Sequence, residues 1–260
     1  MNLKEATAAL ASAGLDEPQR EARILERNAP DAATFAEYVK RRAAREPVAY
    51  ILGRKEFWSL EFEVSPAVLI PRPDSEALVE TALEHFKNQP PQTILDLGTG
   101  SGCLLVALLS EWPNATGLGI DISPQAVELA RRNAARHNQG ARAAFTTGDW
   151  THDLSRRFDL IISNPPYITA PELLSLERDV IAYEPRGALD GGADGLEPLK
   201  RITSGLATVM QPNARVMIEL GVDQAASATA ILVNAGFEVL QIAKDLGGRD
   251  RVIVARLPHI

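Results

Sequence analysis

The sequence predicts an α/β protein in which a mostly parallel β-sheet is covered by helices on both faces. From residue 93 onward, short apolar runs alternate with longer amphipathic segments, which is the pattern of parallel strands joined by helices. Before that point residues 3–47 show only helical periodicity, and residues 58–64 alternate between apolar and polar side chains as a strand does. We therefore expect a helical bundle over residues 1–48, a β-hairpin linker over residues 49–73 and an α/β domain over residues 74–260.

The N-terminal part is expected to form three short helices. Leu3, Ala6 and Leu10 share one face of the first helix. Asp16 and Asp31 precede the second and third helices and are the expected N-cap residues. A bundle of this size is typical of a docking module, or of a cover over apolar surface of the larger domain.

The linker is expected to be a two-stranded connector. The alternating residues 58–64 form one strand, and residues 66–73 are the expected partner strand. Asp74 or Ser75 can then cap a helix. That helix would bury Leu78, Ala82 and Phe86.

The α/β domain is expected to contain a sheet closed by an antiparallel strand. The expected strands are residues 93–97, 116–120, 142–145, 158–163 and 215–220, followed by residues 237–242 and 251–256. The expected helices are residues 102–111, the segment capped by Ser123, and residues 196–210 and 222–235. Residues 184–195 are rich in Gly and Asp and are expected to form a loop near the entrance of the site.

The composition is that of an ordinary soluble globular protein, with 45% hydrophobic and 23% charged residues. The net charge of −7 argues against a protein that grips nucleic acid directly. The one cysteine, Cys103, excludes an internal disulfide and fits a reducing compartment. The apolar run over residues 103–109 is too short to span a membrane, and the four His residues show no metal-site spacing. A cytoplasmic location, no metal and a monomeric state are therefore the expectations.

The segment Asn164-Pro165-Pro166-Tyr167 stands at the carboxyl end of an expected buried strand, where open α/β sheets bind ligands. Each proline fixes φ and lacks an N–H, so the backbone is stiff there. The side-chain oxygen of Asn164 and the carbonyl of Pro165 suit an NH2 group, which offers two donors, and Tyr167 can stack on a planar amide or base. An Asn-Pro turn by itself is common, and only its combination with the motifs below favours a site.

A glycine-rich loop follows the first expected strand of the domain. It consists of Gly98, Thr99, Gly100, Ser101 and Gly102. Its glycines allow a tight turn and close approach of the backbone to a ligand. A nicotinamide dinucleotide site is the rival interpretation, but that pattern requires Gly or Ala where this chain has Cys103, and it leaves Asn164 to Tyr167 without a role.

Two further strand ends carry candidate ligand contacts. Asp121 can accept both hydroxyls of a ribose. Asp149 can accept from the amino group of an adenine, and Trp150 can cover its ring. Taken singly, a surface carboxylate explains Asp121 equally well, and a turn residue explains Asp149 better. For Arg72 and Arg186, organisation of the site loop and a plain salt bridge are equally good interpretations.

With these residues assembled, the chain resembles the class I S-adenosylmethionine-dependent methyltransferases, whose sheet is Rossmann-like. It is more narrowly similar to the PrmC (also called HemK) family, which methylates a glutamine of peptide chain release factors. The narrower resemblance rests on residues 50–53, 69–76, 184–189 and 245–251. Ser75 stands where that family more often has threonine, and Ser101 is another variant of its loop. The tetrapeptide Asn164–Tyr167 is shared with DNA adenine methyltransferases and does not fix the substrate.

The resemblance implies that Gly98 to Gly102, Asp121, Trp150 and Asn164 contact the methyl donor S-adenosyl-L-methionine. It implies that Asn164 to Tyr167 hold the glutamine of a Gly-Gly-Gln loop in the release factor. Two alternatives stay open from the residues alone. One is an adenine-N6 methyltransferase acting on nucleic acid, and the other is a non-catalytic module that binds the donor or a translation factor.

Overall fold

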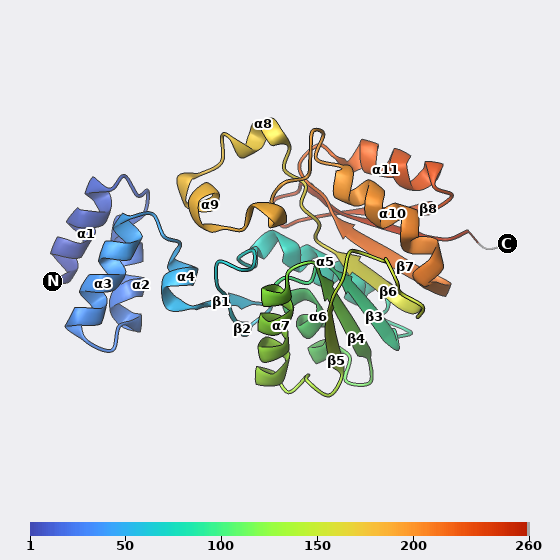
Figure 1. Ribbon diagram of the computed structural model, residues 1–260, viewed down its shortest axis with the longest axis horizontal. Helices are drawn as coiled ribbons and strands as arrows, with labels where there is room; N and C mark the ends of the chain where they lie inside the picture. The colour runs from blue at the N-terminus through green and yellow to red at the C-terminus, as the bar shows by residue number, and fades with distance from the viewer. Residues whose placement is uncertain (259–260) are drawn as a thin grey trace.

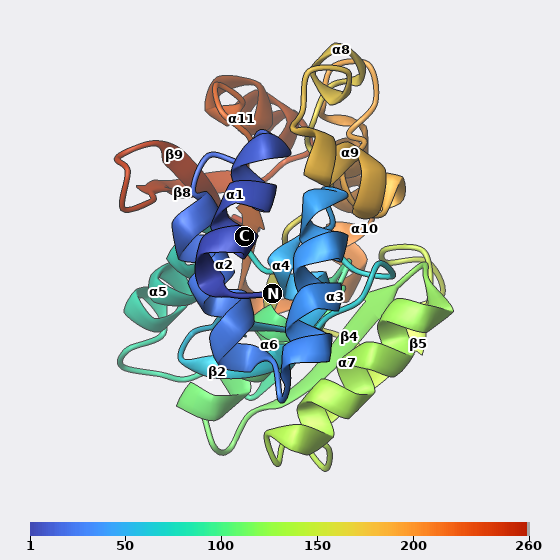
Figure 2. The same ribbon diagram turned by 90° about the vertical axis from the view of Figure 1, so that its left-hand side faces the viewer.

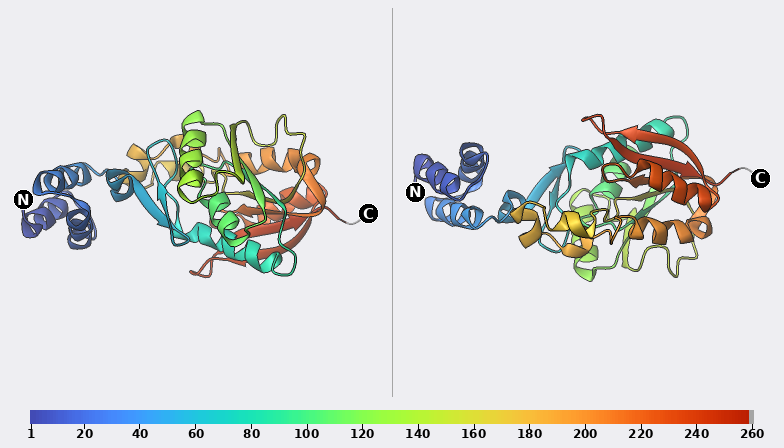
Figure 3. Two further views of the ribbon diagram at one scale, coloured as in Figure 1. Left: turned by 90° about the horizontal axis from the view of Figure 1, so that it is seen from below. Right: turned by 90° about the horizontal axis from the view of Figure 1, so that it is seen from above.

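The computed structural model describes residues 1–258 and has two lobes along its long axis (Figure 1). The N-terminal lobe is a helical bundle that projects from the larger α/β lobe (Figure 3). Its helices are α1 (Leu3–Ser12), α2 (Pro18–Asn28), α3 (Ala32–Ala43) and the short α4 (Val48–Leu52). Figure 2 shows this bundle from its free end, in front of the sheet. No helix within residues 1–258 is long and apolar enough to cross a lipid bilayer.

The predicted caps of the bundle are correct in one case and wrong in the other. Asp31 caps α3, because its side chain accepts a hydrogen bond from the backbone N–H of Thr34 at 2.7 Å. Asp16 does not cap α2, whose N-cap residue is Glu17 without a side-chain bond. Since Pro18 opens α2 and has no N–H, one donor that a cap would serve is missing from this end.

The hairpin linker uses a different pair of strands from the predicted one. Strands β1 (Arg54–Phe57) and β2 (Leu60–Glu63) pair antiparallel. Trp58 and Ser59, expected within a strand, form the turn with φ of 52° and 57°. Two consecutive positive φ values are the signature of a two-residue hairpin turn, which matches the twist of the strands.

The prediction that residues 66–73 form the partner strand is wrong. Residues 66–72 lie in no strand, and residue 73 begins the short 3-10 helix η1 (Pro73–Ser75). The prolines in this segment cannot donate to a ladder. Val68 and Ile70 are buried in a small cluster with Tyr50, whose hydroxyl donates to the Val68 carbonyl at 2.6 Å. The segment is therefore a pinned irregular strap beside the sheet.

Within the described residues the main sheet has seven strands in the order β5-β4-β3-β6-β7-β9-β8. The strands are β3 (Thr93–Leu97), β4 (Thr116–Asp121), β5 (Ala143–Thr147), β6 (Phe158–Ser163), β7 (Met210–Glu219), β8 (Glu238–Lys244) and β9 (Asp250–Arg256). The first five strands in this order, from β5 through β4, β3 and β6 to β7, run parallel to one another. Strand β9 lies between β7 and β8 and is antiparallel to both. This confirms the predicted class and the antiparallel closure.

Helices cover both faces of the sheet. On one face lie α5 (Glu76–His85), α6 (Cys103–Glu111) and α7 (Pro124–Arg136), and on the other α10 (Glu197–Val209) and α11 (Ala225–Asn234). Each face of the sheet forms a hydrophobic core with its helices. Ile94 of β3 packs into the core on the first face, whereas Leu95 and Leu97 of the same strand pack into the core on the second face, because side chains alternate along a strand. The two cores hold the strand ends in a fixed relation.

The connection from β6 to β7 contains elements that were not predicted. These are α8 (Ala170–Leu173), α9 (Arg178–Tyr183) and the 3-10 helix η2 (Arg186–Ala188), ahead of α10. Neither α8 nor α9 has a fully buried residue, so neither carries the apolar stripe from which a helix is predicted. Figure 1 shows this gold segment extending toward the N-terminal bundle.

Candidate active site

A cavity of about 700 Å³ opens at the carboxyl ends of β3, β4 and β6. It brings together most of the residues predicted from separate motifs. The predicted residues that line it are Gly98, Thr99, Gly100, Ser101, Asp121, Asp149, Trp150, Asn164 and Pro166. Gly102, Pro165 and Tyr167 are not among the residues that line it.

The loop after β3 depends on its glycines. Positive φ values of 74°, 53° and 79° occur at Gly98, Gly100 and Gly102. A Cβ on Gly98 would lie 3.3 Å from the Trp150 ring, and one on Gly102 would lie 3.1 Å from the Cβ of Ala130. Because the loop is packed closely on both sides, its backbone forms one wall of the cavity.

Asp121 braces this loop as well as facing the cavity. Its Oδ2 accepts from the backbone N–H of Gly100 at 2.8 Å, and its Oδ1 accepts from that of Ser123 at 2.9 Å. Burial raises the pKa of the Asp121 carboxyl, and these backbone hydrogen bonds oppose the rise. Each carboxylate oxygen can accept a second hydrogen bond, so Asp121 can still receive hydroxyl groups from a ligand.

A second carboxyl group lies under the loop. Asp96 is 1% exposed, and its Oδ2 accepts from the Thr99 hydroxyl at 2.6 Å. Its Oδ1 has no hydrogen-bond partner among the described residues. Burial raises the pKa of Asp96 to about 7, with a further rise from the nearby Asp121 and an opposing effect of the Thr99 bond. Asp96 does not line the cavity, so its place is beneath the loop that forms the cavity wall.

Trp150 and Asp149 also line the cavity, with the Trp150 ring beside Gly98. Trp150 has φ of 51°, a strained conformation for a bulky residue and one that recurs at ligand sites. Asp149 accepts from Arg201 of α10 at 2.5 Å, and both side chains are about half exposed. Arg201 also lines the cavity and was not predicted from the sequence.

The amide of Asn164 is held in one orientation. Its Nδ2 donates to the Ser75 hydroxyl at 3.0 Å, and Ser75 is buried at the junction of η1 and α5. The Asn164 Oδ1 accepts no hydrogen bond from any described residue and is left available at the cavity. An available side-chain oxygen here suits a ligand N–H.

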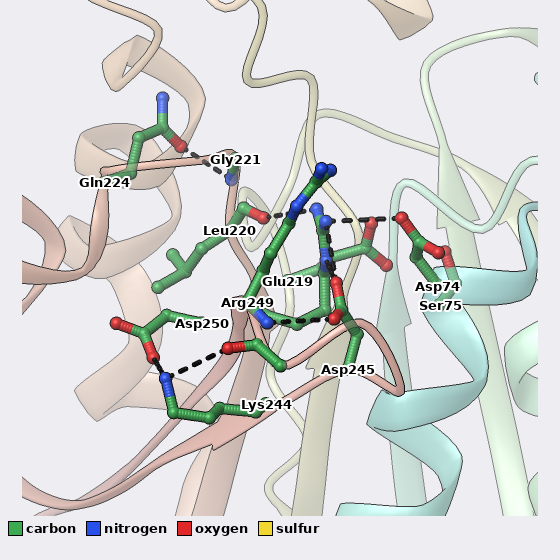
Figure 4. A network of polar contacts seen from close by, with 12 residues as sticks. Asp74, Ser75, Glu219, Leu220, Gly221, Gln224, Lys244, Asp245, Arg249 and Asp250 are labelled. Atoms are coloured by element: carbon green, nitrogen blue, oxygen red, sulfur yellow. Dashed lines mark hydrogen bonds and ion pairs between the residues drawn. The ribbon is translucent and has the colours of Figure 1, made fainter.

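Tyr167 turns away from the cavity. Its hydroxyl lies 3.4 Å from Oε1 of Glu219, and its carbonyl accepts from Nε2 of Gln224 at 3.0 Å. Burial raises the pKa of the Tyr167 hydroxyl above its usual value. A Cβ on Gly221 would lie 2.9 Å from the Tyr167 ring. The end of the tetrapeptide is thus fixed by Glu219 at the end of β7 and by residues that follow this strand, Gly221 and Gln224 (Figure 4).

Arg72 and Arg186, for which the sequence allowed two interpretations, make different contacts. Arg72 donates to Oε1 of Glu184 at 2.5 Å, and Oε2 of the same buried carboxylate accepts from the Ile70 N–H at 3.1 Å. Arg72 therefore joins the strap to the loop over residues 184–195, several of whose residues line the cavity as predicted. Arg186 is exposed and pairs with Asp190 at 3.3 Å.

Sequence reasoning missed Glu219, Gln224 and Arg201 as supports of the site. Glu219 is an acidic residue at the end of an apolar strand, the same signal that identified Asp121. Ser75 was recognised as a candidate cap and as part of the family motif over residues 69–76. Its contact with Asn164 was not predicted, because the two residues are 89 positions apart in the chain.

Known proteins resemble this chain in sequence. Residues 75–183 match the family described as the methyltransferase small domain, and residues 26–53 match the PrmC N-terminal domain. A release factor glutamine methyltransferase from Caulobacter vibrioides is 40% identical, over 94% of this chain and 91% of that protein. One from Cereibacter sphaeroides is 39% identical, over 98% of this chain and 97% of that protein.

Solved structures resemble the fold. A methyltransferase from Pyrococcus furiosus superimposes with a TM-score of 0.58, at 19% identity, over 85% of this chain and 98% of that one. A ribosomal protein L11 methylase from Lactobacillus delbrueckii superimposes with a TM-score of 0.55, at 21% identity, over 75% and 83% of the two chains.

Proposed function

Because the chain belongs to the release factor glutamine methyltransferase family, we propose that it methylates the glutamine of the Gly-Gly-Gln motif in peptide chain release factors. The methyl group comes from S-adenosyl-L-methionine and goes to the side-chain amide nitrogen (N5), leaving S-adenosyl-L-homocysteine. The modification would modulate translation termination. The observation that carries the proposal is the Asn164 amide, oriented by Ser75 on the same cavity as the glycine loop.

The residues present fit the donor. The backbone of Gly98 to Ser101 lines the cavity and, with the tight turn at Gly98, lets a ligand approach closely. Asp121 keeps acceptor capacity for ribose hydroxyls, and Trp150 offers a ring face beside the loop. When bound, the donor supplies a methyl group on a positively charged sulfur, which is a strong electrophile.

The contribution of the chain is mainly to position the substrate. An amide nitrogen is a poor nucleophile because its lone pair is delocalised into the carbonyl. The Asn164 oxygen at the cavity would hold one of its N–H bonds, and the carbonyl of Pro165, the next residue in the chain, would hold the other if the substrate reaches past the cavity wall. Both acceptors would favour positive charge developing on nitrogen in the transition state. Holding the reacting atoms in line supplies on the order of 7–11 kcal/mol in favourable cases.

The proton balance requires one further step. A C–N bond forms, the C–S bond breaks with its electron pair going to sulfur, and one proton must leave nitrogen. The tetrapeptide contains no strong base, so we propose that the proton leaves late or after methyl transfer, to solvent.

The remaining parts of the chain receive proposed roles. Residues 1–48 would dock the release factor, residues 49–73 would link the lobes, and residues 74–260 would carry the reaction. We propose a monomeric cytoplasmic enzyme, in keeping with its single cysteine and its substrate class, without direct binding of nucleic acid.

A methyl-transfer assay tests the proposal. Labelled donor is offered with purified release factor and, separately, with duplex DNA that contains adenine. We expect label on the release factor, and its loss when the Gly-Gly-Gln glutamine is replaced. Label on DNA alone would support the adenine-N6 alternative, and donor binding by calorimetry without any transfer would support a non-catalytic module.

A further inference from the structure

A fully buried asparagine of α7 joins the glycine loop to the linker hairpin. Asn133 does not line the cavity. Its Nδ2 donates to the Ser101 carbonyl at 2.9 Å and to the Glu63 carbonyl at 3.0 Å, and its Oδ1 accepts from the Glu63 N–H at 2.7 Å. One planar amide therefore contacts the loop that forms the cavity wall and the last residue of β2.

The three contacts allow only one orientation of this amide. An amide oxygen accepts and an amide NH2 donates, so the flipped group would place its oxygen against two carbonyls and its NH2 against an N–H. Asparagine is a poor helix former, and a buried amide is costly unless its polar groups are bonded. The place of Asn133 within α7 is therefore explained by the two segments that it joins and not by the helix itself.

The hairpin depends on α7 for part of its backbone bonding. Figure 1 shows the hairpin between the N-terminal bundle and α7. Within the described residues β2 pairs only with β1, so its other edge presents unpaired backbone groups. Asn133 bonds both backbone groups of Glu63 at this edge, and the His137 ring contacts the Glu61 carbonyl at 2.8 Å. Arg132 also pairs with the Glu63 carboxylate at 2.8 Å, but both side chains are partly exposed, and such pairs contribute little.

The glycine loop is held from two directions. Asp121 of β4 accepts from the Gly100 N–H at 2.8 Å, and Asn133 donates to the carbonyl of the next residue, Ser101. Ser101 is buried and lines the cavity. The Asp121 contact does not involve the linker. The Asn133 contact does, because the same NH2 group also donates to the Glu63 carbonyl.

We propose that Asn133 is a positioning residue that couples the docked state of the linker hairpin to the shape of the glycine loop, and thereby to binding of the methyl donor. The inference rests on the proposed function, because it takes S-adenosyl-L-methionine as the ligand of the loop. A hairpin that leaves α7 removes both contacts with Glu63, and the amide is then free to turn away from Ser101. Because such coupling is reciprocal, a bound donor must in turn hold the hairpin in place.

The first test is Asn133→Ala, which removes all three hydrogen bonds. Calorimetry with S-adenosyl-L-homocysteine should give a Kd about tenfold higher than in wild type, the equivalent of about 1.4 kcal/mol. The KM for the donor should rise with this Kd, but kcat at saturating donor should stay at the wild-type value, because Asn164 and its partner Ser75 are unchanged. Arg132→Gln breaks the exposed pair with Glu63 on the same helix and is the matched control, which should bind as wild type does.

The second test is hydrogen exchange in the wild-type protein. S-adenosyl-L-homocysteine should slow exchange of the Glu63 amide by about tenfold more than exchange of the Val64 amide. The Val64 N–H donates to the Gly53 carbonyl at 3.1 Å, and it is the internal reference because this bond lies within the linker. Arg132→Gln should show the same difference between the two amides, and Asn133→Ala should lose it.

A wild-type Kd in Asn133→Ala, or equal protection of the Glu63 and Val64 amides in wild type, would overturn the proposal. So would a parallel loss of kcat, donor affinity and melting temperature in Asn133→Ala, which would indicate a purely structural role. If that variant fails to fold, the exchange measurement on wild type decides.

Failure of the proposed function gives a different result. The Kd and exchange measurements use no release factor, so a wild-type protein that binds S-adenosyl-L-homocysteine but transfers no methyl group to a release factor would refute the proposed function alone. A wild-type protein that does not bind S-adenosyl-L-homocysteine would refute both.

Discussion

The Arg42 guanidinium donates to the Asp179 carboxylate across 2.6 Å and so joins α3 of the N-terminal bundle to α9, 137 positions later in the chain. Arg42 is 6% exposed and also donates to Glu21 of α2 at 2.7 Å. The Tyr183 hydroxyl donates to the Ala44 carbonyl at 2.9 Å beside it. The segment that leaves the active site after Tyr167 is therefore anchored on the N-terminal bundle.

Replacing Arg42 should destabilise the protein. Arg42→Met leaves the partly buried Glu21 without its cation and Asp179 with only Arg45 at 3.7 Å, and breaking such a buried pair costs about 3 kcal/mol in the free energy of unfolding. Urea denaturation measures this change. Arg20→Met, at an exposed pair with Glu17, is the control and should change stability by less than about 0.5 kcal/mol. Equal effects of the two variants would contradict the anchoring role.

Removing the Asn164 side chain should separate catalysis from donor binding. Asn164→Ala deletes the oxygen that faces the cavity, and loss of one oriented group of this kind costs about 10²–10³ in kcat. Calorimetry should show the donor Kd largely unchanged, because the glycine loop and Asp121 are intact. The exposed Asn234→Ala serves as the control. Equal loss of turnover and of donor affinity would mean that Asn164 is structural.

A side chain at Gly98 should weaken donor binding. Gly98→Ala adds a Cβ 3.3 Å from the Trp150 ring at a residue with φ of 74°. The left-handed conformation costs about 1 kcal/mol for an L-residue, so we expect a lower melting temperature. The donor Kd should rise by roughly tenfold, or about 1.4 kcal/mol, because the loop must shift. Gly140→Ala, where the Cβ would lie at an ordinary 3.6 Å from Ala135, should change neither quantity.

Asp96 should make stability depend on pH. Its pKa is raised in the folded protein from 3.8 to about 7, so the folded state holds this proton more tightly than the unfolded state does. The contribution of Asp96 is therefore most favourable at low pH and is lost as the pH rises through about 7. Asp96→Asn should gain stability relative to wild type progressively as the pH rises from about 4 to about 7, with no further gain above that, measured by urea denaturation. The exposed Asp16→Asn should show no such change, and a gain in the opposite direction would refute the assignment.

Much of the α/β fold could be predicted because its signals are local. The strands ending at Leu97, Asp121 and Ser163 are short apolar runs, each followed by a turn or a polar residue. The positive φ values in the loop after β3 fall on glycines that the sequence already displays. The stiffness of Asn164 to Tyr167 follows from two adjacent prolines.

The errors in the predicted elements arose where a strand or helix depends on contacts with another part of the chain. The alternating residues 58–64 predicted a strand correctly in type, but the turn at Trp58 and Ser59 selected residues 54–57 as the partner. Helices α8 and α9 have no buried residue: Leu174, directly after α8, is 86% exposed, and Ile181 of α9 is 51% exposed. The position of α9 depends instead on the ion pair of Arg42 with Asp179.

The sequence by itself determined the alternation of strands and helices, the glycine loop and the rigid tetrapeptide, because each depends on conformational limits of neighbouring residues. Only the tertiary structure decided which groups stand behind that tetrapeptide. Ser75 lies 89 positions from Asn164, and Glu219 lies 52 positions from Tyr167. A hydrogen bond between such residues depends on how strands are ordered in the sheet, and no local pattern in the chain encodes that distance.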